Sequence, residues 1–344
     1  MVRAAAAPRE DLHMPPHVRA ATLPDIPRLT ELLEADARRR QARSPILWAM
    51  ADDAPARIGE ALTFALAAPE QPFRQFWQVA DVGGEIRGIV HSMSLPVPPI
   101  YAGAPGEPGL ILADSLVAPD APEGTAEALL GAAEAALREA GARVLLASVT
   151  EGGPWGASLG ARGYDPLTLY LSRTGLGRAA MPPEIRPAAE PDLPGIVAHS
   201  AQNRRVLFEI DPFWAIHPDA DARFSAWMAR SLTLPDRDML VMGAEGCVEG
   251  YVVAQPASRL HFPPAHDIAA IGVVDDFYHP DLADPAATAG EAPGASALLR
   301  GAEAAFAARG VAAAFVVCPA GWRSRIRTLE AAGYETAMTW SVRR

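Results

Sequence analysis

The sequence contains the same unit twice, and this duplication constrains the fold more than any other feature. Short motifs recur in the same order in both halves, at a nearly constant separation. The matched pairs are Val18-Arg19-Ala20-Ala21 with Ile185-Arg186-Pro187-Ala188, Asp25-Ile26-Pro27 with Asp192-Leu193-Pro194, Trp48 with Trp214, Gly88 with Gly250, Asp114 with Asp276, Leu129-Leu130 with Leu298-Leu299, and Gly163-Tyr164 with Gly333-Tyr334. The period is far longer than that of solenoid repeats, so we expect a duplicated domain-sized α/β unit.

Each unit has the pattern β-α-α-β-β-β-α-β-α-β. In the first, apolar residues at helical spacing, a hairpin around Gly83-Gly84 and alternating strand segments follow one another. The Gly-, Ala- and Pro-rich stretch 175–183 separates the two units. The sequence therefore predicts a loose N-terminal tail (1–16), a first domain (17–174), a linker (175–183) and a second domain (184–344). We call residues 17–174 the first half and residues 184–344 the second half.

Composition excludes several classes of protein. A chain of 344 residues that is 50% hydrophobic can bury two cores, but it has no apolar run long enough to span a bilayer. A net charge of −11 argues against a general nucleic-acid binder, which needs a basic face. Two cysteines do not make a disulfide framework, so a cytoplasmic location is expected. All 30 basic residues are arginine, which excludes a lysine Schiff base and a P-loop lysine.

Two stretches combine a strand, a turn with small residues and a helix. They are Leu112 to Ala126 followed by Leu129-Leu130, and Val274 to Ala295 followed by Leu298-Leu299. With the element order above and the Gly-Tyr pairs near each end, the chain resembles the GNAT superfamily of N-acetyltransferases, twice. The resemblance implies an α/β (α+β) fold, with a mixed, mostly antiparallel central sheet flanked by helices in each half.

The resemblance also implies a reaction and its participants. These are an acyl-CoA co-substrate, with acetyl-CoA expected first, a small-molecule amine as acceptor, and no metal. A helix start and small residues let backbone N–H groups approach the coenzyme pyrophosphate. The implied coenzyme-binding residues are Leu116, Val117, Glu123, Gly124, Thr125 and Ala126 in the first half, and Phe277, Tyr278, His279, Gly294, Ala295 and Ser296 in the second. The turns depart from the family pattern, because Ala121 stands at its basic position and Pro293 removes an N–H donor.

Carboxylates on the central strands are the candidate bases. The amine must be neutral to attack a thioester, so Asp276, Asp275 and Asp114 are predicted to help remove its proton. Alternate strand residues face opposite sides, so only one of Asp275 and Asp276 can face a cleft. Tyr278 is the candidate acid at the end of the same strand. For each of these residues, a purely structural role stays open.

Aromatic residues that follow the first helix of each half are candidates for an acceptor pocket: Trp48, Phe213 and Trp214. Packing of each tryptophan within its own half is the alternative. Arg323, Arg325 and Arg327 either meet the 3′-phosphate of the coenzyme or form a solvated face.

Three functions remain open at this point. The first is an acyl-CoA-dependent N-acyltransferase, monomeric or homodimeric, in which one half has a degenerate site. The second is a non-catalytic protein of the same fold that senses a ligand or serves as a scaffold. The third is a thioester-dependent decarboxylase, which would bind the coenzyme without needing an amine.

Overall fold

The structure confirms the predicted order of elements in both halves. It is a computed structural model that describes residues 15–153, 155–177 and 180–344, so most of the predicted tail lies outside the described residues. The first half contains β1 (His17–Ala20), α1 (Ile26–Arg43), α2 (Ala54–Ala67), β2 (Gln75–Val82), β3 (Glu85–Ser94), β4 (Pro108–Ile111), β5 (Leu116–Val117), α3 (Thr125–Glu139), β6 (Val144–Thr150), α4 (Trp155–Ala161) and β7 (Asp165–Thr174).

The second half repeats this order without a counterpart of β5, the short strand that the first half adds to the predicted pattern. It contains β8 (Ile185–Pro187), α5 (Leu193–Ile210), α6 (Ala220–Ser231), β9 (Asp238–Met242), β10 (Gly250–Pro256), β11 (Ile271–Tyr278), α7 (Pro293–Ala308), β12 (Ala313–Pro319), α8 (Arg323–Ala331) and β13 (Glu335–Arg343). Four short 3-10 turns complete the described elements: η2 (Leu23–Asp25), η3 (Glu190–Asp192), η4 (Pro212–Trp214) and η5 (Pro280–Leu282).

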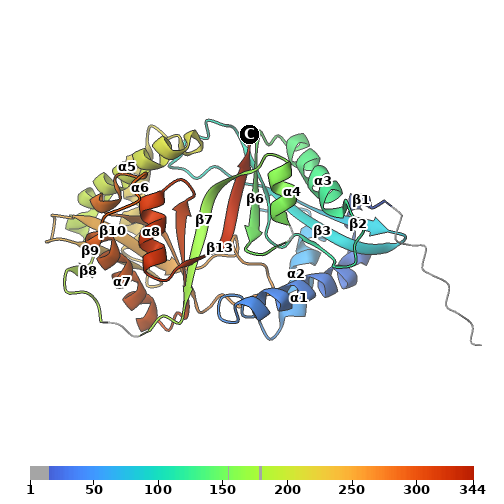
Figure 1. The fold of residues 1–344 in the computed structure, drawn as a ribbon, viewed down its shortest axis with the longest axis horizontal. Coiled ribbons are helices and arrows are strands. Elements are labelled where there is room, and N and C mark those ends of the chain that lie inside the picture. Colours follow the sequence, from blue (N-terminus) through green and yellow to red (C-terminus); the bar gives the residue numbers. More distant parts are fainter. Residues whose placement is uncertain (1–14, 154, 178–179) are drawn as a thin grey trace, which may run out of the picture.

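The strands of both halves join in a single sheet. Among the described residues this sheet has 13 strands, in the order β1-β2-β3-β4-β6-β13-β7-β12-β11-β10-β9-β8, with β5 paired to β3. The last strand of each half therefore pairs inside the other half: β13 lies beside β6, and β7 lies beside β12 (Figure 1). The division into domains at 175–183 stays a prediction, but the sheet itself is continuous across it.

Charged side chains mark the two exchanged strands in the same way. Arg343 of β13 forms an ion pair of 2.7 Å with Glu134 of α3, and Arg173 of β7 forms one of 2.9 Å with Glu303 of α7. Each pair joins the exchanged strand to the helix that covers the receiving half of the sheet. Corresponding ion pairs therefore accompany the strand exchange in both halves.

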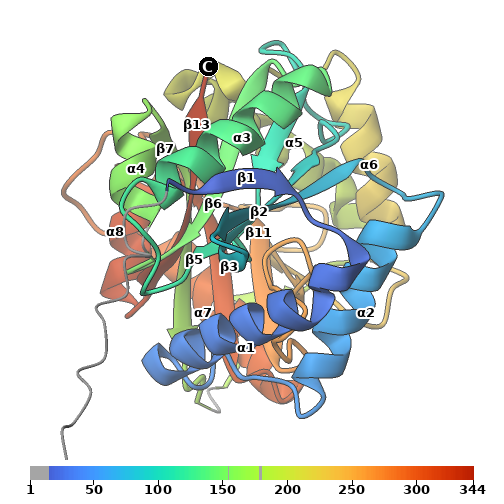
Figure 2. The ribbon, with the colours of Figure 1, turned by 90° about the vertical axis from the view of Figure 1, so that its right-hand side faces the viewer.

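Helices cover both faces of the sheet. In the first half α1 and α2 pack on one face around Leu29, Ile58 and Val79, while α3 and α4 pack on the other around Leu130 and Trp155. Figure 2 shows α1 and α2 below the strands of this half and α3 above them. In the second half α5 and α6 lie above the sheet and α7 lies below it (Figure 1).

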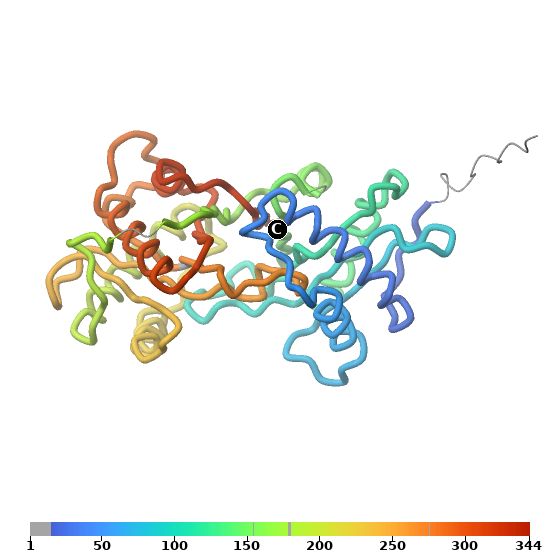
Figure 3. The backbone as a smooth tube through the Cα atoms, turned by 90° about the horizontal axis from the view of Figure 1, so that it is seen from below, coloured from blue at the N-terminus to red at the C-terminus, as the bar shows by residue number. Residues whose placement is uncertain are grey.

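Two long loops cross from one half to the other. The loop after β3 (95–107) reaches the second half, where Tyr101 forms a β-bridge with Ile216. The loop after β10 (257–270) reaches the first half, where His266 bridges Met50. Both loops cross the middle of the molecule in Figure 3, where the C-terminus also lies. Each half consequently supplies part of the surroundings of the other half's central strands.

Candidate functional site

The central strands of each half separate at corresponding places. Parallel β4 and β6 pair as far as Ile111 and Ala147, after which residues 112–115 leave the ladder and β5 pairs with β3 instead. Parallel β11 and β12 pair as far as Val274 and Val316. Ligands of open α/β sheets bind beyond the carboxyl ends of parallel strands where neighbouring connections diverge, so these two separations are the places to look for sites.

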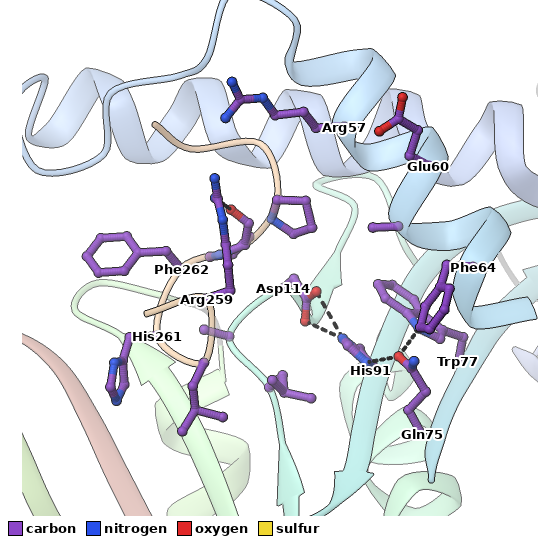
Figure 4. A pocket seen from close by; sticks show the side chains of 16 residues that line it. Arg57, Glu60, Phe64, Gln75, Trp77, His91, Asp114, Arg259, His261 and Phe262 are labelled. Carbon is purple, nitrogen blue, oxygen red and sulfur yellow. Dashed lines mark hydrogen bonds and ion pairs between the residues drawn. The ribbon is translucent and has the colours of Figure 1, made fainter. Parts of the chain in front are cut away.

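Cavity A lies beside the first separation. It has a volume of about 590 Å³ and is lined by α2, β2, β3, residues 112–114 and residues 259–264 of the crossing loop (Figure 4). The second half therefore forms one wall of a cavity whose polar groups come mainly from the first half. Its size falls in the range of small-molecule sites.

A hydrogen-bonded chain of side chains lines cavity A. His91 Nδ1 lies 2.9 and 3.0 Å from the two Asp114 carboxylate oxygens, and His91 Nε2 lies 3.0 Å from Gln75 Oε1. The indole N–H of Trp77 donates to the same Gln75 oxygen at 3.3 Å, and the Trp77 ring stacks on His91 at 3.9 Å. Because Gln75 Oε1 accepts from Trp77, the hydrogen bond to it assigns His91 Nε2 as a donor, and His91 Nδ1 faces the Asp114 carboxylate.

Cavity B lies next to cavity A and is smaller, about 260 Å³. Its walls are α1, residues 115–117, residues 148–150 and Trp155. Ala113 lines both cavities, so they meet at the irregular segment between β4 and β5. The predicted residues Leu116 and Val117 both lie in this wall. Trp155 donates its indole N–H to the Ser115 carbonyl at 3.0 Å, which fixes the floor of the cavity.

Arg40 lies near the junction of the two cavities. Its side chain is buried, pairs with Asp36 at 2.7 Å and donates to the carbonyl of Ala113. Its Nη1 has no hydrogen-bond partner among the described residues. An unpaired buried donor costs free energy, and the Arg40 side chain lines cavity B, which makes Nη1 a candidate donor to a ligand's acceptor atom.

The start of α3 is open. Gly124 takes a left-handed conformation with φ of 82°, and Thr125 is buried with its hydroxyl donating to the Pro122 carbonyl at 2.6 Å. Among the described residues, no side chain accepts a hydrogen bond from the backbone N–H groups of Ala126 or Glu127. Glu123 is exposed beside them. The predicted residues Glu123, Gly124, Thr125 and Ala126 thus form a helix start at which the Thr125 N–H donates to the Pro122 carbonyl at 3.3 Å, while the Ala126 N–H has no side-chain acceptor.

The corresponding start of α7 is closed by the chain itself. Asp281 accepts hydrogen bonds from the N–H groups of Gly294 at 2.8 Å and Ala295 at 3.4 Å. His279 packs directly on Gly294, so closely that a Cβ there would overlap its ring. Ser296 N–H is also used, by the Ala292 carbonyl at 2.9 Å. The predicted second-half residues His279, Gly294, Ala295 and Ser296 therefore lie together, but their donors are occupied.

The second separation is filled as well. Trp322 is fully buried and donates its indole N–H to the Leu282 carbonyl at 2.9 Å. Tyr278 lies 6.3 Å from the Trp322 ring, and burial raises the pKa of Tyr278. Phe277 is fully buried beneath the guanidinium of Arg325, 5.0 Å away. Aromatic packing thus takes the space that corresponds to cavity B.

Cavity C, of about 230 Å³, lies on the other side of the second separation. It is lined by α5, η4, Asp276, α8 and residues 98–101 of the loop from the first half. Asp276 accepts hydrogen bonds from the Tyr251 hydroxyl and from Asn203 Nδ2, the latter at 3.2 Å. Burial raises the pKa of Asp276, against the lowering effect of the Tyr251 hydrogen bond. The Asp275 side chain lies outside the described part of the structure.

The aromatic residues predicted to form an acceptor pocket lie in different places. Trp214 lines cavity C, and Phe213 packs against it edge to face at 4.9 Å. Trp48 lines none of the cavities A to C. It is buried between the halves, 5.2 Å from Phe262 and 6.3 Å from Phe315, because the loop 257–270 packs over it. Arg325 is buried in cavity C, whereas Arg323 is exposed on the same helix.

Comparison of the two halves of the sequence does not reveal several polar residues of these sites, because the other half has no polar counterpart or no matching motif. His91 corresponds to Val253, so comparison of the halves hides it, although its place on the hairpin opposite Asp114 was available from strand pairing. Arg40 and Gln75 become part of a site only through tertiary contacts.

Among the described residues, no group of three or more His, Cys, Asp or Glu side chains is placed to hold a metal ion. No helix in the described ranges is both long and apolar enough to cross a membrane.

Comparisons with known proteins agree on the fold. A scan of protein-family models finds no match to the sequence, and a search of curated proteins finds none either. A GCN5-related N-acetyltransferase from Sphaerobacter thermophilus is similar over 96% of this chain and 96% of its own, with 15% identity and a TM-score of 0.54. A GCN5-related glucosamine N-acetyltransferase region in a fungal multi-domain β-N-acetylglucosaminidase is similar over 99% of this chain and 39% of that chain, with 14% identity and a TM-score of 0.53. The chain therefore has the fold of the GCN5-related N-acetyltransferases, present twice in tandem.

Proposed function

We propose that the first half transfers an acyl group, acetyl in the first instance, from acyl-coenzyme A to a small-molecule amine. The observation that carries this proposal is the meeting of cavities A and B at Ala113, with the Asp114–His91 pair on the side of cavity A. Both of the similar structures described above are N-acetyltransferases by name, which supports the choice of an amine acceptor.

In this proposal cavity B holds the thioester end of the coenzyme. Its walls include strand segments that have left their parallel partners, and the amide-bearing arm of the coenzyme can pair with freed backbone groups there. The open start of α3 supplies N–H groups and a partial positive charge for the pyrophosphate. Arg40 Nη1 is available to the acyl carbonyl oxygen.

Cavity A holds the amine. An ammonium group pairs with the Asp114 carboxylate, which then takes its proton, directly or through a water molecule. The neutral nitrogen attacks the thioester carbonyl, a carbon–nitrogen bond forms and the carbon–sulfur bond breaks. The proton that the nitrogen then loses passes to the departing thiolate, directly or through water. Most of the rate enhancement comes from holding nitrogen and thioester in line across the junction.

The second half has a different role in the proposal. Asp281 occupies the helix start and Trp322 fills the strand separation, so coenzyme binding would have to displace both. We infer that this half does not bind the coenzyme and instead contributes strand β13 and the wall of cavity A. The protein then acts as a monomer or homodimer with one active centre per chain.

Calorimetric titration of the full chain with acetyl-CoA tests these assignments. We expect one molecule bound per chain, with thiol release on addition of primary amines such as glucosamine. Asp114→Asn keeps coenzyme binding and lowers turnover about 100-fold or more, whereas the matched second-half variant Asp276→Asn leaves turnover unchanged.

Each alternative has its own outcome. Neither heat nor thermal stabilisation at about 1 mM acetyl-CoA would favour the non-catalytic protein, because a bound ligand must stabilise the fold. Binding of two molecules per chain would contradict the role given to the second half. Loss of carbon dioxide from a carboxylated acyl-CoA without an amine would favour the decarboxylase.

A further inference from the structure

Cavity C carries a set of buried polar groups that the proposed transferase does not use. Their residues come from α5, η4 and α8, and the first half covers them with residues 98–101. Arg223 holds that cover by donating to the Pro99 carbonyl at 2.8 Å. The cavity is therefore enclosed by both halves and separate from cavities A and B.

Arg325 is the most unusual of these groups. It is 2% exposed, yet none of its guanidinium nitrogens has a hydrogen bond or ion pair within the described residues, and its Nε and Nη2 are fully buried. Its contacts are aromatic: the guanidinium lies 5.0 Å from the Phe277 ring and 5.2 Å from the Trp322 ring. Burying a charge without a partner is strongly unfavourable, so a structural role explains this residue poorly.

Three neighbours have unpaired atoms as well. Arg204 is 1% exposed and uses one amino group on Ser200, at 2.6 Å, and the other on Asp221, but its Nε has no partner. Trp214 Nε1 and Asn203 Oδ1 are also buried and unpaired. All four residues line cavity C. Donors outnumber acceptors among the unpaired atoms, which is the arrangement that suits an anion.

The repeat shows that the fold does not require an arginine at this position. Arg325 lies eight residues before Gly333, and Trp155 lies eight residues before Gly163 in the first half. The same helix position therefore accepts an aromatic side chain. The ring contacts of Arg325 with Phe277 and Trp322 therefore do not require a charged side chain at this position.

Arg325 has no ion-pair partner among the described residues of the cavity. Asp221 forms an ion pair with Arg204. Asp276 attracts Arg325 electrostatically, but no ion pair joins the two side chains. Burial raises the pKa of Asp276, against the lowering effects of the Tyr251 hydrogen bond and of the Arg325 charge. Ile100, Leu207 and Val317 give the rest of the lining an apolar character. The cavity volume is about 230 Å³.

We propose that cavity C binds a small organic carboxylate whose charged group pairs with Arg325 and whose apolar body packs against the lining. Trp214 Nε1 and the Arg204 guanidinium supply further donors to the carboxylate. Because residues 98–101 belong to the other half, such a ligand contacts both halves at once. Its site is independent of acyl transfer in the first half.

Thermal unfolding and tryptophan fluorescence of the full chain provide the test, with benzoate and butyrate as probes and benzamide and butyramide as neutral matches. We expect the two carboxylates, up to about 20 mM, to raise Tm, and the two amides to have no effect. Arg325→Met should weaken carboxylate binding about tenfold or more, as loss of one charge-assisted pair predicts. The exposed Arg323→Met is the matched control and should keep full binding.

The variant also tests the alternative of a structural arginine. Without ligand, Arg325→Met should be as stable as the parent or more stable, because an unpaired buried charge is removed. A lower Tm for the ligand-free variant would overturn the proposal, as would equal shifts from acids and amides or no shift from either carboxylate. Inorganic phosphate serves as a further arm, and a shift as large as that of benzoate would overturn the assignment to a carboxylate with an apolar body.

Discussion

Acidification should destabilise the contact between the crossing loop and the first half through His266. The His266 side chain is fully buried, and its Nδ1–H donates to the Trp48 carbonyl at 3.0 Å. Its Nε2 has no partner within the described residues. Burial lowers the pKa of His266 to about 4, with the positive charge of Arg40 adding to the effect.

The sign and size follow from linkage. The unfolded chain binds a proton at this histidine below pH 6.5, whereas the folded chain does so only below about pH 4. Between these values the unfolded state binds more protons, so the free energy of unfolding falls as the pH is lowered. At pH 5 the loss from this one residue is about 2 kcal/mol.

His266→Gln isolates that contribution. The glutamine amide can still donate to the Trp48 carbonyl but does not titrate, so the difference in unfolding free energy between pH 7 and pH 5 should shrink by about 2 kcal/mol. Urea unfolding followed by tryptophan fluorescence measures it. The exposed His17→Gln is the control and should leave the pH dependence unchanged. An unaltered pH dependence in His266→Gln would refute the reasoning.

Two further predictions concern the exchanged strands and the close packing of the sheet. We expect neither of the separate fragments 1–179 and 180–344 to show a cooperative unfolding transition, because β13 pairs with both β6 and β7 and separation exposes these strand edges. Mixing the fragments should restore the transition. Two stable fragments that do not associate would contradict the strand exchange. Gly250→Ala should cost about 1–3 kcal/mol in urea unfolding, since the new Cβ would lie 2.8 Å from His279 Cδ2 and 2.9 Å from the Tyr278 carbonyl. The control Gly59→Ala, in a helix with nothing within 4 Å, should stabilise by about 0.5–1 kcal/mol, and equal effects of the two changes would count against the packing argument.

Part of the candidate site was accessible from the sequence. Asp114 and Asp276 were identified as corresponding strand carboxylates, and both line cavities beside strand separations. Asp276 does lie on β11, but the strand assignment of Asp114 was wrong, because the chain turns between β4 and β5 at this residue. The small residues at Gly124 and Gly294 were recognised as helix starts. Whether those starts are free depends on Asp281, a residue of the loop before α7, and no local pattern reveals where its carboxylate points.

Other parts depended on contacts distant in sequence. His91 lies 23 residues from Asp114, and a lone histidine on a strand has no periodic signature. Arg325 was one of three arginines on a short helix, and only burial distinguishes it from the exposed Arg323. Trp48 looked like a pocket residue because of its match with Trp214, but it packs against the loop 257–270.

By itself, the sequence determined the duplicated unit, its order of helices and strands, and the resemblance to the GNAT superfamily, because these follow from local periodicity and from ordered motifs. Tertiary structure alone decided that β7 and β13 change places and that each half's loop closes the other's cavity. The physical reason is that a strand's hydrogen-bonding groups are the same whichever half they pair in. Local patterns specify that a segment is a strand, whereas its neighbour is selected by the packing of the whole sheet.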